Sequence, residues 1–138
     1  MQLDVRGPRF AAAVTTLVLV LVLITGSGWL ALAQAVVFAI GAASARYAPY
    51  GWLYRVAVAP RLGPIREREA AGPVRFAQGV GFAFAAIATL GFLSGVTVVG
   101  IVATAFALGA AFLNAAFGFC LGCETYLLAK RLTTRPAN

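Results

Sequence analysis

The two cysteines of this chain carry its clearest pattern for covalent chemistry. They stand three residues apart, as Cys120 and Cys123, within residues 119–126, which read FCLGCETY. A dithiol at this spacing can close to a disulfide and reopen by exchange with another thiol. The sequence contains no histidine, so acid–base catalysis and metal binding by histidine are excluded. The two cysteines are therefore our candidate catalytic residues.

Two other roles for the pair stay open at this stage. Cysteine packs well as a small apolar residue between helices, and the pair would then be structural. A metal site is the other alternative, although two thiolates need further ligands from a second protomer or a partner to reach four. In a reducing cytoplasm a Cys-x-x-Cys pair is typical of redox or metal chemistry rather than of a structural disulfide.

The reactivity of the pair depends on the helix around it. If the last apolar helix continues through the pair, Cys120 and Cys123 lie on one face at its C-terminal end. The helix dipole there and the charge of Glu124 both disfavour a thiolate. Alternatively, Gly118 and Gly122 break the helix and leave backbone N–H groups that stabilise a thiolate. The sequence leaves both arrangements open.

Composition shows what kind of protein positions the pair. Of the 138 residues, 62% are hydrophobic and 11% are charged, whereas soluble domains carry about a quarter charged residues. Residues 10–45 and 76–123 contain no Asp, Glu, Lys or Arg, and each window is long enough for two helices of about 20 residues. Glycine-rich turns divide the windows at 26–28 and 91–95. We predict an all-α protein with four transmembrane helices, near residues 9–26, 29–46, 75–94 and 97–120 or beyond.

The net charge of +7 sets the predicted topology. With this helix assignment every basic residue falls before the first helix, in the central loop or after the last helix, whereas the two hairpin turns have none. By the positive-inside rule, both termini and the loop are cytoplasmic in a bacterial plasma membrane, with anionic lipids as neighbours. We expect no nucleic-acid partner, because the charges form no folded basic face. A cleavable signal peptide ending near residues 31–33 (ALA) is a weaker interpretation, because the apolar sequence continues beyond it. The basic residues are Arg6, Arg9, Arg46, Arg55, Arg61, Arg66, Arg68, Arg75, Lys130, Arg131 and Arg135.

The sequence also contains an internal repeat. Residues 7–11 (GPRFA) recur as 72–77 (GPVRFA), and residues 40–43 (IGAA) are matched by 108–111 (LGAA). We predict one membrane domain spanning 1–138, with a first repeat at 7–62 and a second at 72–132. The repeats are two parallel copies of a helical hairpin. Residues 47–74 are expected to form a cytoplasmic interfacial loop between the hairpins.

Polar residues near the start of the third helix are weaker candidates for a site. Arg75 and Gln78 share a helix face, and an arginine at the positive end of a helix is unfavourable unless it meets an anion. Arg9 occupies the equivalent position in the first repeat. We expect these residues to bind a lipid headgroup or another anionic group, whereas Gln34 and Asn114 are expected to make contacts between helices.

Two motifs carry a resemblance to a known family. Residues 75–81 (RFAQGVG) and 119–126 (FCLGCETY) resemble those of small four-helix bacterial membrane proteins, frequent in actinobacteria and known only as a domain of unknown function. The resemblance runs from Pro8 to Tyr126. Members of that family often accompany thioredoxin-like and rhodanese-like sulfurtransferase proteins. The resemblance therefore implies thiol or sulfur chemistry, with Cys120 and Cys123 as signature residues and Tyr126 in the same motif. The architecture is also similar to quinone-linked membrane proteins of the DoxX and MauE kind.

Three hypotheses about function follow. The first is a membrane partner in thiol–disulfide or persulfide transfer, in which Cys120 and Cys123 react with a cytoplasmic thioredoxin-like or sulfurtransferase protein. The second is a non-enzymatic membrane anchor or assembly subunit for a soluble partner. The third is a carrier of a small sulfur-containing anion that uses Arg9 and Arg75 and needs a homodimer to enclose a pathway. No cofactor is evident from the sequence, and a quinone or a bound metal stays open.

Overall fold

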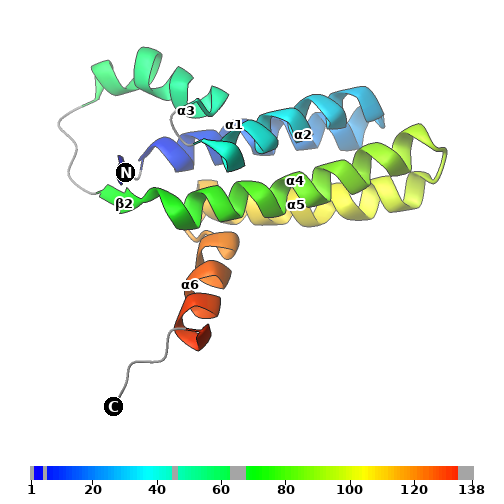
Figure 1. Cartoon of the computed structure of the whole chain (residues 1–138). Helices are drawn as coiled ribbons and strands as arrows, with labels where there is room; N and C mark the ends of the chain where they lie inside the picture. Colours follow the sequence, from blue (N-terminus) through cyan, green and yellow to red (C-terminus); the bar gives the residue numbers. More distant parts are fainter. Residues whose placement is uncertain (1, 5, 45–46, 63–67, 134–138) are drawn as a thin grey trace.

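The computed structural model describes residues 2–4, 6–44, 47–62 and 68–133. Within these ranges the protein is all-α, apart from two three-residue strands. Four long apolar helices form the bulk of the molecule, and two shorter helices lie at one end of it (Figure 1). The elements are β1 (Gln2–Asp4), α1 (Arg6–Thr25), α2 (Gly28–Ala43), α3 (Pro49–Leu53), a π-helical turn η1 (Tyr54–Val58), a 3-10 turn η2 (Ala59–Arg61), β2 (Arg68–Ala70), α4 (Ala71–Leu93), α5 (Thr97–Phe117) and α6 (Leu121–Thr133).

The four long helices pack as two antiparallel hairpins lying side by side (Figure 1). Helix α1 packs mainly against α5, and α2 packs mainly against α4, which also contacts α5. Both helices of each hairpin therefore contact the other hairpin. The two hairpin turns lie together at one end of the bundle, and the starts of α1 and α4 lie together at the other end.

Three of these helices are long and apolar enough to cross a membrane, which indicates a membrane protein. They are residues Arg6–Thr25, Gly72–Leu93 and Thr97–Phe117. The apolar helix α2 has 16 residues and spans about 24 Å at 1.5 Å per residue. Large apolar side chains cover the outside of the bundle, such as Ile24 at 73% exposure and Val98 at 71%. An apolar surface of this extent is suited to lipid rather than to water.

Both hairpins turn at the predicted glycine-rich segments, although residues 91–93 of the second segment still belong to α4. Gly26 and Gly95 adopt φ values of +63° and +89°, a left-handed conformation that glycine reaches without steric cost. The side chain of Ser27 then caps α2 by accepting a hydrogen bond from the backbone N–H of Leu30 at 3.2 Å.

Small side chains fill the contact between the hairpins. One buried cluster joins Val22, Ala31, Ala88 and Ala103, one from each of the four helices. Alanine at such positions lets helix backbones approach closely, which is how membrane helices gain packing energy. Phe38 closes a second cluster, with Ala35 and Ala85.

The segment predicted as an interfacial loop, residues 47–74, is largely regular where the structure describes it. Pro49 occupies the first position of α3, where its missing N–H costs nothing. Strand β2 pairs with β1 in antiparallel register, with Gln2 opposite Ala70 and Asp4 opposite Arg68. This pairing ties the start of α1 to the start of α4. Arg46, Arg66 and Arg135 lie outside the described residues.

Candidate functional site

Helix α5 ends just before the cysteine pair. Gly118 takes a φ of +68°, and its N–H donates to the carbonyl of Asn114 at 2.9 Å. The N–H of Phe119 donates to the carbonyl of Leu113 at 3.3 Å, which completes a glycine C-cap. The expectation of one helix running through residue 120 is therefore wrong, because left-handed Gly118 stops it.

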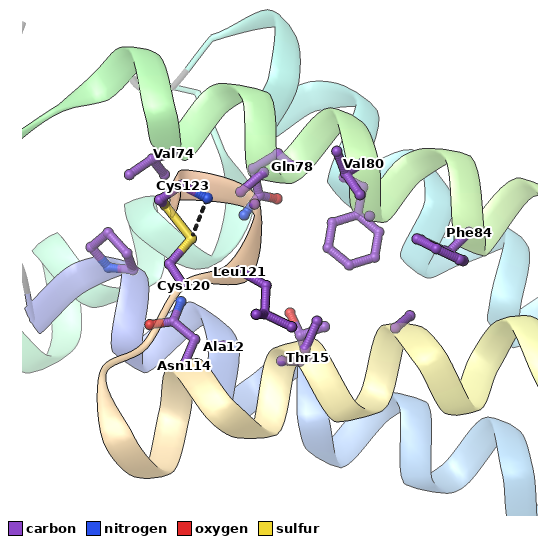
Figure 2. A pocket seen from close by; sticks show the side chains of 18 of the residues that line it. Ala12, Thr15, Val74, Gln78, Val80, Phe84, Asn114, Cys120, Leu121 and Cys123 are labelled. Atoms are coloured by element: carbon purple, nitrogen blue, oxygen red, sulfur yellow. Dashed lines mark hydrogen bonds between the residues drawn. A yellow bond between two sulfur atoms is a disulfide. The ribbon is translucent and has the colours of Figure 1, made fainter. Parts of the chain in front are cut away.

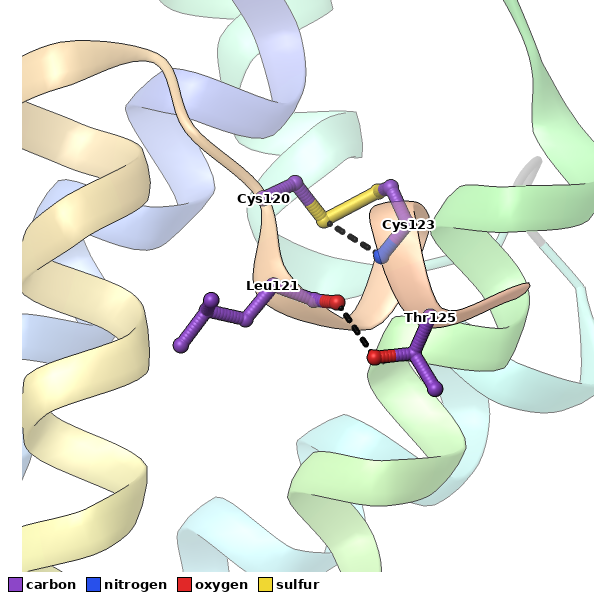
Figure 3. The surroundings of a disulfide bond; sticks show 4 residues. All are labelled: Cys120, Leu121, Cys123 and Thr125. Atoms are coloured by element: carbon purple, nitrogen blue, oxygen red, sulfur yellow. Dashed lines mark hydrogen bonds between the residues drawn. A yellow bond between two sulfur atoms is a disulfide. The ribbon is translucent and has the colours of Figure 1, made fainter. Parts of the chain in front are cut away.

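Cys120 instead lies directly before a new helix, α6, and caps its start. Its Sγ accepts a hydrogen bond from the backbone N–H of Cys123 at 3.0 Å, and its carbonyl accepts one from Glu124 at 3.0 Å. Cys120 and Cys123 are joined by a disulfide, with their Cα atoms 5.1 Å apart (Figure 3). The pair thus occupies the positive end of the α6 dipole, where a thiolate is favoured, and not the negative end of α5.

Helix α6 is held against α4 by two contacts. A Cβ atom placed on Gly122 would lie 2.6 Å from the Cβ of Ala77, so the two backbones touch where glycine removes the side chain. Tyr126 packs its ring against Phe76, with centroids 5.6 Å apart, and its hydroxyl lies against Gly72. Gly122, which the sequence suggested as a second helix break, is therefore a contact inside α6.

Glu124 lies exposed in the first turn of α6. A carboxylate is favoured at this end of a helix by the dipole. Glu124 therefore stabilises the same helix terminus that positions Cys120.

The two arginines at helix starts bond to the ends of neighbouring helices. Arg75 donates from Nε to the carbonyl of Ala42 at 2.9 Å and from Nη2 to that of Ala43 at 2.8 Å. Arg9 donates from Nη2 to the carbonyl of Ala115 at 3.3 Å. Carbonyls at a helix C-terminus lack partners within the helix, and a cation also suits the dipole there. Arg75 thus caps α2, and Arg9 caps α5.

A cavity of about 500 Å³ lies next to the disulfide, between α1, α4, α5 and the start of α6. Figure 2 shows Cys120 and Cys123 at one end of the cavity and Phe84 at the other, with Leu121 pointing inward. The lining on α5 runs from Phe106 to Asn114, which is about 12 Å along the helix axis at 1.5 Å per residue. The polar lining residues are Arg9, Thr15, Gln78, Asn114 and Thr125, and the aromatic ones are Phe38, Phe84 and Phe106.

The structure brings together some of the predicted site residues and separates others. Cys120, Cys123, Gly122, Gln78 and Arg9 all line the cavity. Outside this group, Arg75 bonds to the end of α2, Tyr126 packs on α4, and Glu124 is exposed.

The apolar part of the cavity was not predicted from the sequence. Phe84 and Phe106 line it, but an aromatic residue in an apolar helix looks the same whether it faces lipid, a neighbouring helix or a cavity. Asn114 was expected to join helices and lines the cavity instead.

Gln34 lies away from the cavity and makes a contact of the kind expected for it. Its Oε1 accepts a hydrogen bond from the hydroxyl of Tyr50 at 2.7 Å. Burial raises the pKa of Tyr50, so its phenol stays neutral and able to donate. The bond fastens α3 to α2.

Among the described residues no three His, Cys, Asp or Glu side chains gather as metal ligands do. The site in the described ranges therefore consists of a disulfide, two amides, an arginine and an apolar cavity.

The sequence matches a known protein family. The sequence model of a family described as "Domain of unknown function (DUF4395)" matches residues 3–131. The chain belongs to this family. The match includes both hairpins and the cysteine pair of this DUF4395 protein. Searches of curated proteins and of solved structures find no match to the chain.

Proposed function

We propose that this DUF4395 protein is a membrane partner in thiol–disulfide exchange, and that the Cys120–Cys123 pair is its reactive group. One observation carries the proposal. The disulfide closes across the first turn of α6, with a backbone N–H directed at Cys120 Sγ at 3.0 Å. A thiolate released at Cys120 would be stabilised by that N–H and by the helix dipole, as in reactive cysteines at helix N-termini.

The proposed exchange takes two steps. A thiolate of a soluble dithiol protein attacks Cys120 Sγ, which forms a mixed disulfide and releases Cys123 as a thiolate that takes up a proton. The second thiolate of the partner then attacks its own bridged sulfur and releases Cys120. The partner leaves as a disulfide, and the membrane pair is left as a dithiol. In the reverse direction Cys120 is the attacking cysteine.

We further propose that four helices cross the membrane and that both termini lie in the cytoplasm, so that the exchange takes place at the cytoplasmic surface. Although α2 is short, it follows α1 through a two-residue turn, and its last carbonyls bond to Arg75 near the start of α4. This arrangement supports a full crossing by α2. Arg6 and Arg9 lie at the start of α1, Arg75 lies near the start of α4, and Lys130 and Arg131 lie in the last turn of α6. These elements lie at the same end of the bundle, so the positive-inside rule favours the cytoplasm for that end (Figure 1).

The orientation of α6 favours access by a soluble partner. Leu121, Leu128 and Leu132 share one face of α6, and Leu121 points into the cavity between the membrane helices (Figure 2). At 100° per residue, Cys123 and Lys130 lie on roughly the opposite face. We therefore place α6 on the membrane surface, with Leu128 and Leu132 toward lipid, Lys130 toward water and the half-buried disulfide between the cavity and the aqueous boundary.

Matching contacts in the two halves support an internal duplication. Phe10 and Tyr54 pack with ring centroids 5.8 Å apart, and Phe76 and Tyr126 do so at 5.6 Å. Tyr54 lies against Gly7, as Tyr126 lies against Gly72. The glycine and phenylalanine of each set fall in the repeated residues 7–11 and 72–77, and their tyrosine partners extend the likeness to α6 and the segment that follows α2.

The class of partner follows from the chemistry of the pair. A soluble protein with its own exposed Cys-x-x-Cys, such as a thioredoxin-like or sulfurtransferase protein, supplies the two thiols that the exchange requires. The cationic residues of α6, Lys130 and Arg131, favour a partner with an acidic rim.

Trapping of mixed disulfides tests the proposal. Cys123→Ser keeps the attacking cysteine and removes the resolving one, so it should accumulate a covalent adduct with a soluble thiol protein in cells. The Cys120→Ser variant should accumulate less, and the double serine variant none. Adducts are identified by non-reducing electrophoresis and mass spectrometry, which also detects a persulfide on the retained cysteine. If neither single variant forms an adduct and the native thiols do not respond to oxidant, the proposal is wrong.

A further inference from the structure

We propose that the cavity beside the disulfide binds the ring of a lipid-soluble quinone, which accepts the electrons of the Cys120–Cys123 dithiol. This inference rests on the proposed function and extends it, because it names the co-reactant that restores the disulfide. It follows from three features of the cavity: its contact with the disulfide, its polar and apolar ends, and its reach to the lipid-facing surface.

The two side-chain amides of the cavity lie at its cysteine end. Gln78 on α4 and Asn114 on α5 line it together with both cysteines (Figure 2). Neither side-chain amide bonds to another residue in the ranges that the structure describes. An amide N–H is a suitable donor to a quinone carbonyl. Two amides beside a disulfide in a cavity of about 500 Å³ fit a flat ring with polar oxygens, and this volume is in the range of ligand pockets.

The other end of the cavity is apolar and reaches the outside of the bundle. Phe38 is 7% exposed and lies inside, whereas Phe106 lines the cavity and is 65% exposed. The rings of Phe84 and Phe106 lie 6.1 Å apart and flank this end. In a membrane the exposed face of Phe106 meets lipid, so a molecule can enter from the bilayer. A ligand that enters from the bilayer and presents polar oxygens to the disulfide must be amphipathic. A quinone with an isoprenoid tail has both properties.

The electron balance of the step requires a two-electron acceptor of this kind. When the sulfur–sulfur bond forms, the two thiols of Cys120 and Cys123 lose two electrons and two protons. The quinone takes up both electrons and both protons and leaves as the quinol. The resulting disulfide can then oxidise another soluble dithiol, so electrons pass from a cytoplasmic protein to the membrane pool.

The test uses the full-length protein in lipid nanodiscs. The protein is reduced, freed of reductant without oxygen and mixed with decylubiquinone, and the loss of quinone absorbance and of free thiols is followed. Ala111→Phe places a ring in the cavity, since Ala111 lines it. Ala105→Phe makes the same change at an exposed site on the same helix that does not line the cavity. We expect oxidation that saturates with quinone, about tenfold slower in Ala111→Phe and unchanged in Ala105→Phe.

A second variant covers the case in which Ala111→Phe does not fold. Asn114→Leu removes one amide with little change in volume and should raise the quinone concentration for half-maximal rate. Oxidation that does not saturate, or that is equally fast in both phenylalanine variants, overturns the inference.

Exchange with soluble reduced thioredoxin, measured separately, distinguishes this inference from the function on which it rests. A pair that exchanges with thioredoxin but does not reduce quinone refutes the quinone site alone. A pair that does neither refutes the proposed function as well.

Discussion

Replacing Gly122 with alanine should displace α6 and with it the disulfide. The new Cβ would lie 2.6 Å from the Cβ of Ala77 and 2.7 Å from its Cα, whereas carbon atoms in contact sit about 3.5–4.0 Å apart. One of these atoms belongs to the backbone, so the clash cannot be relieved by a rotamer change. Helix α6 must move away from α4 by about 1 Å. Overpacking of this kind costs about 1–3 kcal/mol, offset by at most about 1 kcal/mol from the better helix propensity of alanine.

Two measurements detect the displacement. Unfolding in mixed detergent micelles should show a lower free energy of unfolding for Gly122→Ala. Alkylation of the reduced protein by a maleimide should be faster at the cysteines, because the N-terminus of α6 is less tightly held. Gly109→Ala is the matched control, since a Cβ at Gly109 meets nothing within 4 Å and alanine there should leave stability unchanged or raise it. If Gly122→Ala and Gly109→Ala behave alike in both assays, α6 does not dock on α4 as described.

Further predictions concern the cap of α2, the hydrogen bond between Tyr50 and Gln34, and the membrane topology. Arg75→Gln should lower the free energy of unfolding by about 1 kcal/mol, because the exposed guanidinium loses its bonds to the end of α2, and Arg75→Lys should fall between the two. Tyr50→Phe should cost about 1–3 kcal/mol, because it leaves the oxygen of Gln34 buried without a partner, and a Gln34→Leu, Tyr50→Phe double variant should recover part of this loss. The contribution of that bond should persist at neutral pH and disappear as pH rises through the raised pKa of Tyr50, which unfolding at pH 8 and above 11 would test. In a chain without its native cysteines, Ser94→Cys should react with an impermeant maleimide on intact cells and Thr133→Cys only after permeabilisation; labelling of both on intact cells would contradict the proposed topology.

The apolar helices were predictable because their signal is long and simple. Windows without charge, divided by glycine at 26–28 and 91–95, placed both ends of the first three helices within four residues of the observed bounds. The fourth helix was predicted to run to residue 120 or beyond, and it ends at Phe117. Gly118 was recognised as a potential break. Whether the helix continues through Gly118 depends on the tertiary contacts that the following residues make. Here the docking of Gly122 against Ala77 on α4 supplies that tertiary reason.

The cysteine pair of the candidate site could be identified from the sequence, but its electrostatic environment could not. Cys120 and Cys123 stand out by type and spacing alone. Whether their environment favours a thiolate depends on which end of which helix they occupy. Because α5 ends three residues earlier than predicted, the pair lies at the positive end of α6 and not at the negative end of α5. Arg75 shows a related limit. Its position at the start of a helix suggested an anion, whereas its bonds go to the C-terminal carbonyls of α2, a pairing between segments that no local pattern encodes.

The first half of the chain shows that this scaffold does not need cysteines to hold its peripheral helix in place. Tyr54 and Tyr126 make matching contacts with α1 and α4. Counting back six and three residues from Tyr126 gives the two cysteines, and the same count from Tyr54 gives Ala48 and Gly51. The segment that contains Ala48 and Gly51 still packs on α1 without any disulfide, and Tyr54 there is 3% exposed. Because alanine and glycine occupy the equivalent positions in the first half, packing alone does not require cysteine in the second half. This comparison favours a chemical role for Cys120 and Cys123, which line the cavity, whereas Ala48 and Gly51 are not among its lining residues.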